Sequence, residues 1–387
     1  MPEKFIPLSV PNLKGRELEY VTHAVETEWV STAGPYVTEL EKRIAEYVGT
    51  PSSVACQSGT AGLHIALQLC GVKAGDLVLV PTLTFIAAVN PVRYLGAEPM
   101  FMDCDDTLCM DPLKLKAFCE EECEMRGDTL FHVATGKRIP AMVVVHVFGN
   151  MADMESILTI AGRYNIEVIE DATEALGTKY IEGPYAGRFA GTMGAIGVYS
   201  FNGNKIVTAG GGGMIVSADE ELLKEAKHLT TQAKADEANF IHDEVGYNYR
   251  LTNLQAALAL AQLEQLEGFI DVKISNYEHY IELLSDIPGL SILPFREGIR
   301  SNHWFYSLVC NKPYPLTNME LIDKLRLNSI QSRPIWGLIH EQKPYAGSYT
   351  YKIEKACDYW KKVVNLPCST NLTSDDVERV ASVIREG

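Results

Sequence analysis

Residues 57–61 (QSGTA) combine groups that can cradle a phosphate with the start of a predicted helix. Gly59 would let a ligand approach the backbone closely, and the N–H groups and dipole of a helix N-terminus favour an anion. The same residues are also typical of a plain helix cap by Ser58 or Thr60. The segment therefore predicts either a phosphate turn or an ordinary helix start.

Two further segments place reactive side chains directly after predicted strands. Residues 166–171 (IEVIED) end in Asp171, and residues 199–205 (YSFNGNK) lead to Lys205 ahead of four glycines at 210–213. An aspartate at a strand end can hold a protonated nitrogen heterocycle, and a buried lysine can form an imine with an aldehyde cofactor. A solvated acid and a surface lysine after an Asn-Gly turn are the plainer interpretations, and the glycines fit a phosphate cradle or a mobile loop.

The order of these segments is more informative than any one of them. A phosphate turn comes first, a carboxylate after a strand follows, and Ser200 and Lys205 stand five apart before the glycines. Together they supply a phosphate clamp, a partner for a pyridinium nitrogen and an imine lysine, which pyridoxal phosphate requires. Because open parallel sheets bind ligands beyond the C-terminal ends of their strands, we interpret the segments as one site.

The elements that must position these residues alternate along the first two-thirds of the chain. Short apolar runs at 77–80, 99–102, 142–147, 166–169 and 196–199 predict strands, and 36–48, 59–70, 85–95, 112–120 and 152–163 predict helices. Short continuous apolar strands between helices indicate a mostly parallel sheet that is covered on both faces.

From about residue 250 the pattern changes. A long amphipathic helix is predicted to begin near Leu254 and to lead out of the first domain. Short strands are predicted at 307–310, 330–331 and 365–366. We therefore expect a large α/β domain over residues 1–260, which includes an N-terminal arm, and a smaller α+β domain over 261–387.

Composition excludes several classes of partner. The formal net charge of -16 over 387 residues argues against a nucleic-acid ligand. No stretch approaches the roughly 20 apolar residues that span a bilayer, and the N-terminus lacks the pattern of a signal peptide. The nine cysteines show no metal-ligand spacing. The pair Cys119 and Cys123 has no second pair of ligands that would complete a zinc site. We expect no metal, no membrane contact and a reducing cytoplasmic location.

Six segments of the chain resemble one protein family. They are residues 29–35 (WVSTAGP), 58–64 (SGTAGLH), 81–85 (PTLTF), 170–172 (EDA), 200–205 (SFNGNK) and 246–251 (GYNYRL). They run in the order found in the DegT/DnrJ/EryC1/StrS sugar aminotransferases. The resemblance implies the type I, aspartate-aminotransferase-like fold and dependence on pyridoxal phosphate.

The resemblance also implies the chemistry of two residues. Lys205 would form the Schiff base with pyridoxal phosphate and move the proton between cofactor and substrate carbons. Asp171 would pair with the pyridinium nitrogen and keep it protonated. Glutamate would load the cofactor with an amino group, and a keto-sugar nucleotide would take it in a second half-reaction.

Further residues would hold the cofactor. By the resemblance, Gly59, Thr60 and Ser200 hold its phosphate and Phe85 lies against its ring. Asn248 would reach the phosphate in the neighbouring subunit, so the active unit is expected to be a homodimer with shared sites. Whether dimers pair further is left open.

Glu174 departs from the family pattern, which commonly has Gln or His near the phenolic oxygen of the ring. A carboxylate beside a phenolate is repulsive unless one of them is protonated or a cation lies between them. The contact of Glu174 with the cofactor therefore depends on its protonation.

The substrate is indicated by two stretches. Residues 200–213 look like members that serve legionaminic-acid-type nonulosonate and amino-dideoxyhexose pathways for surface glycans. Those members aminate the keto carbon of a UDP- or GDP-linked 4-keto-6-deoxy sugar. In residues 333–340 (RPIWGLIH), Arg333 and His340 could face the sugar nucleotide and Trp336 could offer an apolar plane. Trp336 fits equally well as a core residue of the small domain.

Three other functions compete with this one. A sugar dehydratase on the same fold would carry histidine at the position of Lys205. A non-catalytic regulatory homologue would have lost Lys205 or Asp171, and both are present. A P-loop protein would need the order GxxxxGK[ST], which the glycine run lacks.

Overall fold

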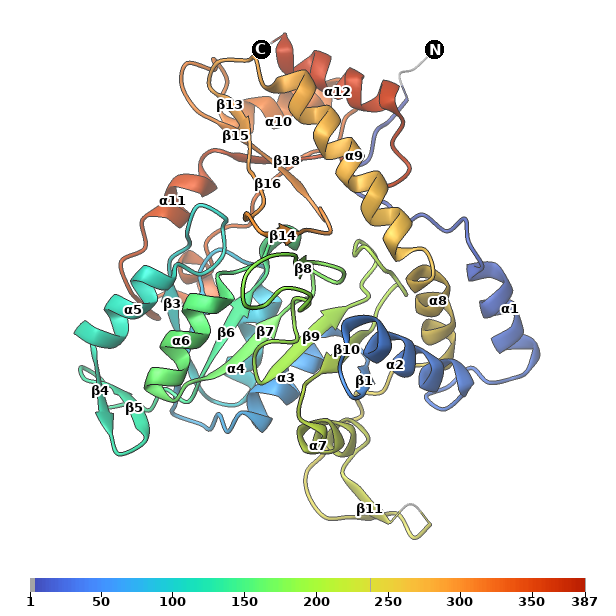
Figure 1. Ribbon diagram of the computed structural model, residues 1–387, viewed down its shortest axis with the longest axis vertical. Coiled ribbons are helices and arrows are strands. Elements are labelled where there is room, and N and C mark those ends of the chain that lie inside the picture. The colour runs from blue at the N-terminus through green and yellow to red at the C-terminus, as the bar shows by residue number, and fades with distance from the viewer. Residues whose placement is uncertain (1–3, 237, 387) are drawn as a thin grey trace.

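A computed structural model describes residues 4–236 and 238–386 of the chain. Its centre is an eight-stranded sheet in the order β1-β10-β9-β7-β6-β2-β3-β17 (Figure 1). The strands are β1 (Ser53–Cys56), β2 (Leu77–Pro81), β3 (Glu98–Met102), β6 (Ala141–Val145), β7 (Glu167–Asp171), β9 (Ile196–Ser200), β10 (Gly213–Val216) and β17 (Tyr349–Thr350). All neighbours from β9 to β17 are parallel, and β10 runs antiparallel to β1 and β9. The predicted mostly parallel α/β sheet is confirmed.

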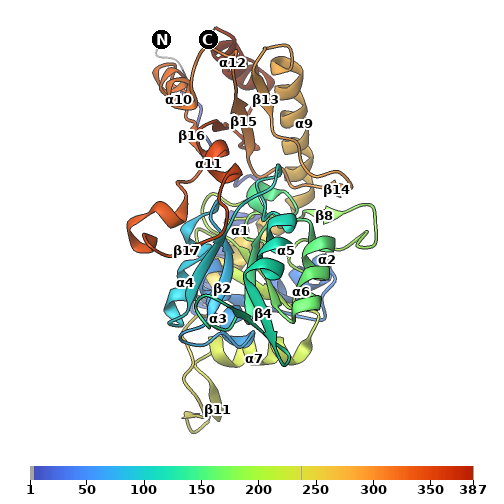
Figure 2. The same cartoon turned by 90° about the vertical axis from the view of Figure 1, so that its left-hand side faces the viewer.

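Helices cover both faces of this sheet. Figures 1 and 2 show α5 and α6 on one face and α3 and α4 on the other. The α-helices are α1 (Glu17–Glu26), α2 (Pro35–Val48), α3 (Gly59–Leu69), α4 (Asn90–Tyr94), α5 (Pro112–Glu121), α6 (Met154–Tyr164), α7 (Glu220–Thr230), α8 (Asn253–Leu263), α9 (Leu266–Leu284), α10 (Asn318–Leu327), α11 (Lys355–Trp360) and α12 (Ser374–Arg385). Short 3-10 turns are η1 (Ile86–Ala88), η2 (Val147–Gly149), η3 (Ile339–Glu341) and η4 (Lys343–Tyr345). No helix of the described residues is long and apolar enough to cross a membrane.

A second, antiparallel sheet lies at one end of the molecule. It has the order β13 (Leu290–Ile292), β15 (Tyr306–Cys310), β18 (Val363–Leu366) and β16 (Arg333–Pro334). Figures 1 and 2 place it with α9, α10 and α12, opposite the hairpin of β11 (Lys234–Asp236) and β12 (Ile241–His242). The remaining pairs are β4 (Cys123–Arg126) with β5 (Thr129–His132) and β8 (Lys179–Tyr180) with β14 (Ile299–Arg300). The predicted boundary at 260/261 falls inside α8 and stays a prediction.

Three predicted elements differ from the structure. The helix predicted over 85–95 is split into η1 and α4, because Pro91 lacks the N–H that a continuous helix would need and instead stands in the first turn of α4. The long helix from Leu254 is two helices, α8 and α9, separated by a turn. The strand predicted at 330–331 is a single bridge from Ile330 to Ile6, because the N-terminal segment takes up its backbone groups, and β16 follows it.

The sheet brings the ends of three strands to one edge. β7 and β9 are parallel, and β1 has the same direction because two antiparallel steps through β10 restore it. Asp171 ends β7, Ser200 ends β9, and the turn after β1 leads into α3. The three chemically informative segments therefore meet at the C-terminal edge.

Candidate active site

A cavity of about 430 Å³ lies at this edge of the sheet. Nine of the predicted site residues line it: Gly59, Thr60, Phe85, Asp171, Glu174, Ser200, Lys205, Arg333 and Trp336. Because these residues come from both sheets and from segments up to about 280 residues apart, their meeting is a property of the fold.

Two predicted residues do not line this cavity. Nδ1 of His340 lies 2.6 Å from the hydroxyl of Thr82, and burial lowers the pKa of His340 below its ordinary value. Asn248 forms a bridge with Thr231 at the base of the β11–β12 hairpin. Asn248 is therefore not part of the cavity in its own chain.

The turn into α3 is both a cap and a wall of the cavity. Ser58 is the N-cap, and its hydroxyl accepts a hydrogen bond from the N–H of Ala61 at 3.1 Å. A Cβ atom at Gly59 would come within 2.8 Å of Cγ2 of Thr173 and 3.2 Å of Cβ of Ser200. Glycine is therefore required where a helix N-terminus, with its partial positive charge, faces the cavity.

Asp171 presents a buried carboxyl to the same cavity. Its Oδ1 accepts the N–H of Thr173 at 3.1 Å, and among the described residues it has no ion pair. Burial raises the pKa of Asp171, although the hydrogen bonds from Thr173 and the charge of Lys205 act against this. A cationic ring nitrogen beside this carboxyl would favour its ionised form.

The adjacent carboxylate, Glu170, points away from the cavity and holds the structure behind it. Its Oε2 accepts from Nε2 of His146 at 2.8 Å and from the N–H of Gly191 at 2.8 Å. Nδ1 of His146 accepts the N–H of Ala152, so Nε2 carries the proton given to Glu170. Burial acts to raise the pKa of Glu170, but His146 and the backbone N–H groups hold it below its ordinary value. Sequence analysis did not identify His146, because only the fold brings it to Glu170.

Lys205 lies between a carboxyl and an aromatic ring. Its Nζ is 3.5 Å from Oε1 of Glu174 and 4.1 Å from the ring centroid of Trp304. The other oxygen of Glu174 accepts the N–H of Phe148 at 2.8 Å. Burial raises the pKa of Glu174 to about 7, while Lys205 and the Phe148 N–H act to lower it. A neutral carboxyl is therefore accessible near neutral pH, and it could donate to a phenolate without repulsion.

Three further predicted residues line the cavity, two with aromatic rings and one with a positive charge. Phe85 is 55% exposed although it lines the cavity, so its ring face is available to a flat ligand. Trp336 lines the cavity and also packs against Phe148 with ring centroids 4.5 Å apart. Its contact with a sugar stays a prediction. Arg333 is exposed on β16.

These groups fit pyridoxal phosphate. The helix start at Gly59 faces the cavity and would bind the phosphate. The buried carboxyl of Asp171 would pair with a cationic ring nitrogen, and Lys205 lines the same cavity. The donor set therefore matches the three handles of the cofactor, and Phe85 offers a face for its ring.

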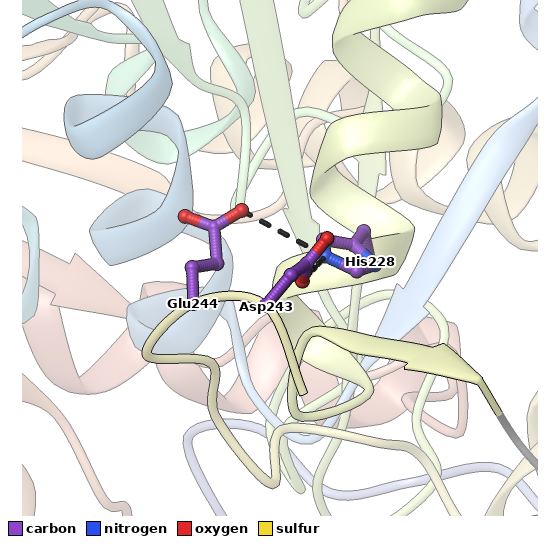
Figure 3. A group of neighbouring side chains, drawn as sticks. All are labelled: His228, Asp243 and Glu244. Atoms are coloured by element: carbon purple, nitrogen blue, oxygen red, sulfur yellow. Dashed lines mark hydrogen bonds and ion pairs between the residues drawn. The ribbon is translucent and has the colours of Figure 1, made fainter. Parts of the chain in front are cut away.

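A group of potential metal ligands lies elsewhere, on α7 and after β12. Nε2 of His228 is 2.8 Å from Oδ1 of Asp243 and 3.7 Å from Oε1 of Glu244 (Figure 3). The hydrogen bond from His228 lowers the pKa of Asp243. Because the two carboxylates are exposed, we interpret the group as a polar contact that ties the hairpin to α7.

Comparison with known proteins agrees with this geometry. The model of the DegT/DnrJ/EryC1/StrS aminotransferase family matches residues 11–385. EpsN of Bacillus subtilis, whose name describes a pyridoxal phosphate-dependent aminotransferase, is 36% identical over 386 residues, or 98% of this chain and 95% of EpsN. GDP-perosamine synthase of Caulobacter vibrioides is 35% identical over 384 residues, covering 98% and 97%. The structure of DesI with its TDP-sugar product has a TM-score of 0.86 at 25% identity and covers 99% of this chain and 93% of DesI.

Proposed function

Because this chain belongs to the DegT/DnrJ/EryC1/StrS aminotransferase family, we propose that it transfers the amino group of glutamate to a UDP- or GDP-linked 4-keto-6-deoxyhexose. The chain is a pyridoxal-phosphate-dependent sugar aminotransferase. The acceptor, the donor and the residues that serve them are our proposal. The similarity to GDP-perosamine synthase over nearly the whole chain supports a nucleotide-linked sugar as the acceptor.

Lys205 would anchor the cofactor through an imine, and five further residues would hold it. The N–H groups at Gly59 and Thr60 and the hydroxyl of Ser200 would bind its phosphate, since a helix N-terminus attracts an anion. Asp171 would accept the proton of the ring nitrogen, and Phe85 would cover one face of the ring. Pyridoxal phosphate supplies an electron sink for the substrate carbon that loses its proton.

Lys205 would move that proton. Lys205 lines the cavity, and its amine would remove a proton from one carbon and return it to another. Glu174 and Trp304 both lie within reach of the amine, so they limit the directions from which it can act. The side chain of Lys205 is 12% exposed, which restricts water at the atom that carries the proton.

One cavity would serve both substrates in turn. Glutamate and the sugar nucleotide both carry negative charge, and Arg333 lines the cavity as a cation that could meet either of them. The apolar plane of Trp336 would lie beside the sugar. The first product would leave the cavity before the second substrate binds, which gives ping-pong kinetics.

The active unit would be a homodimer with shared sites. Asn248 does not line the cavity of its own subunit, and the nearby hairpin exposes apolar side chains, with Phe240 73% and Val245 81% exposed. A partner subunit would bury these side chains and receive Asn248 at its cofactor phosphate. This arrangement is what the family resemblance implies.

The proposed pathway is the synthesis of a surface glycan. Surface-glycan synthesis is supported by relatives named for GDP-perosamine and for spore coat polysaccharide. Legionaminic-acid-type synthesis is one pathway of this kind, and it rests on the resemblance of residues 200–213 alone. The nine unpaired cysteines and a nucleotide-sugar substrate favour the cytoplasm as the location.

The observation that carries the proposal is that Lys205, Asp171 and Glu174 share one cavity with the Gly59 turn. The test supplies the holoenzyme with glutamate that carries an isotopically labelled amino nitrogen, together with UDP- or GDP-linked 4-keto-6-deoxyhexoses. Mass spectrometry should find the label in one sugar nucleotide, and the Lys205→Ala protein should give none. A product that has lost oxygen without gaining nitrogen would identify a dehydratase instead.

A further inference from the structure

The amine of Lys205 lies over the indole ring of Trp304, with Nζ 4.1 Å from the ring centroid. Trp304 stands in the segment between β14 and β15, about a hundred residues further along the chain. Its side chain is 3% exposed, and it lines the cavity. A desolvated indole face attracts a cation more strongly than an exposed one, so this contact can hold a free ammonium group in place.

The ring of Trp304 is fixed on several sides. Its Nε1 donates to the carbonyl oxygen of Asn204, at 2.8 Å, and Asn204 precedes the lysine. Its backbone oxygen accepts from Nζ of the buried Lys273 at 3.1 Å, and its N–H donates to Oδ1 of Asn302 at 3.0 Å. The ring also packs against Phe305 with centroids 4.2 Å apart. Its face is therefore held at a set place relative to the turn that carries the lysine.

The same segment also positions the second partner of the amine. Nδ2 of Asn302 donates to the backbone oxygen of Glu174 at 2.9 Å, and the carboxyl of Glu174 lies 3.5 Å from the lysine. Residues 302–304 thus hold both groups that contact the free amine of Lys205.

We propose that Trp304 is a positioning residue that holds the free ammonium group of Lys205 while the lysine is not bonded to the cofactor. A lysine nitrogen bonded to the cofactor has fewer N–H groups, and any charge on it is shared with the conjugated ring, so the contact stabilises the released states more than the bonded one. These are the apoprotein and the complex with pyridoxamine phosphate. Each half-reaction must pass between bonded and released lysine, so Trp304 eases the release. The inference rests on Lys205 as the cofactor anchor within the proposed function.

The test compares the binding of two cofactor forms to the apoprotein. Pyridoxal phosphate can bond to Lys205, whereas pyridoxamine phosphate leaves it free. In the Trp304→Leu protein the free amine loses its support, so the ratio of the pyridoxamine phosphate Kd to the pyridoxal phosphate Kd should rise about 3- to 30-fold. Trp304→Phe loses the same N–H donor but keeps a ring face, so its ratio should rise less. An unchanged ratio, or equal weakening of both ligands, would overturn the inference.

A second measurement changes the electron density of the indole ring without changing its shape or removing its N–H. Biosynthetic replacement of the four tryptophans by difluorotryptophan weakens the attraction of the ring for a cation and keeps the N–H. The Kd ratio should rise in the fluorinated wild-type protein and stay constant on fluorination of Trp304→Phe, which retains the other three tryptophans. Equal ratios in fluorinated and ordinary wild-type protein would refute the contact. Neither measurement uses glutamate or a sugar, so both readouts hold even if the proposed substrates are wrong. A Lys205→Ala apoprotein with the wild-type ratio of the two Kd values would disprove Lys205 as the cofactor anchor.

Discussion

Replacement of Glu174 by Gln should change how the stability of the apoprotein depends on pH. Burial raises the pKa of Glu174 from an ordinary 4.5 to about 7 in the folded protein. The folded state therefore keeps a proton that the unfolded state releases, and the stability associated with this group is present below pH 4.5 and is lost as pH rises through 7. One pKa unit corresponds to about 1.4 kcal/mol, and part of the shift is already lost at pH 5, so the loss between pH 5 and pH 8 is about 2 to 3 kcal/mol.

The assay is urea unfolding of the apoprotein at pH 5 and at pH 8. Wild-type protein should lose about 2 to 3 kcal/mol more stability over this interval than Glu174→Gln, because Gln can still accept the N–H of Phe148 but does not titrate. Asp171, whose pKa burial also raises, contributes to the pH dependence of both proteins and therefore cancels in the comparison.

The exposed Glu278 provides the matched control, since Glu278→Gln should follow the wild-type pH dependence. Parallel loss of stability in wild-type and Glu174→Gln proteins would refute the reasoning. It would mean that Lys205 keeps the carboxyl ionised throughout, and that a neutral Glu174 cannot donate to the cofactor.

Three further predictions concern cofactor binding. Borohydride should reduce the wild-type holoenzyme to a covalent cofactor adduct and should give none with Lys205→Ala; an adduct in that variant would mean that another lysine is the anchor. Gly59→Ala should weaken the affinity for pyridoxal phosphate at least tenfold in an absorbance titration, because its Cβ would meet cavity-lining atoms at 2.8 Å, whereas Gly162→Ala, with open space around it, should leave affinity unchanged. Equal affinities in these two variants would count against the phosphate turn. Mixed dimers of Lys205→Ala and Asn248→Ala chains should recover activity through one hybrid site, and inactive, well-folded mixed dimers would argue against shared sites.

Much of the large sheet was predictable because its strands are short apolar runs. Strands β2, β3, β6, β7 and β9 agree with the predicted runs to within a few residues. The edge strands were not predictable in the same way, because β17 joins the sheet through tertiary contacts. It pairs with β3, with Tyr349 opposite Met100, although about 250 residues separate the two in sequence.

The site was predictable where its residues follow strands and was not where they come from distant segments. Lys205 and Asp171 stand at strand ends, and the sequence order alone indicated that they share a cavity. Trp304 carries no local signal, because only the packing of the small sheet brings it over Lys205. His340 matched the family pattern, yet its imidazole is hydrogen-bonded to Thr82 outside the cavity lining.

The most direct test of the central claim is the absorbance spectrum of the purified holoenzyme through one complete cycle. A visible band from the cofactor bonded to Lys205 should shift to the near ultraviolet when glutamate is added, and it should return when the correct 4-keto-6-deoxy sugar nucleotide follows. A band that glutamate shifts and a sugar nucleotide restores is the result that the account predicts. The absence of any band after addition of pyridoxal phosphate, or a band that no amino donor changes, would contradict it.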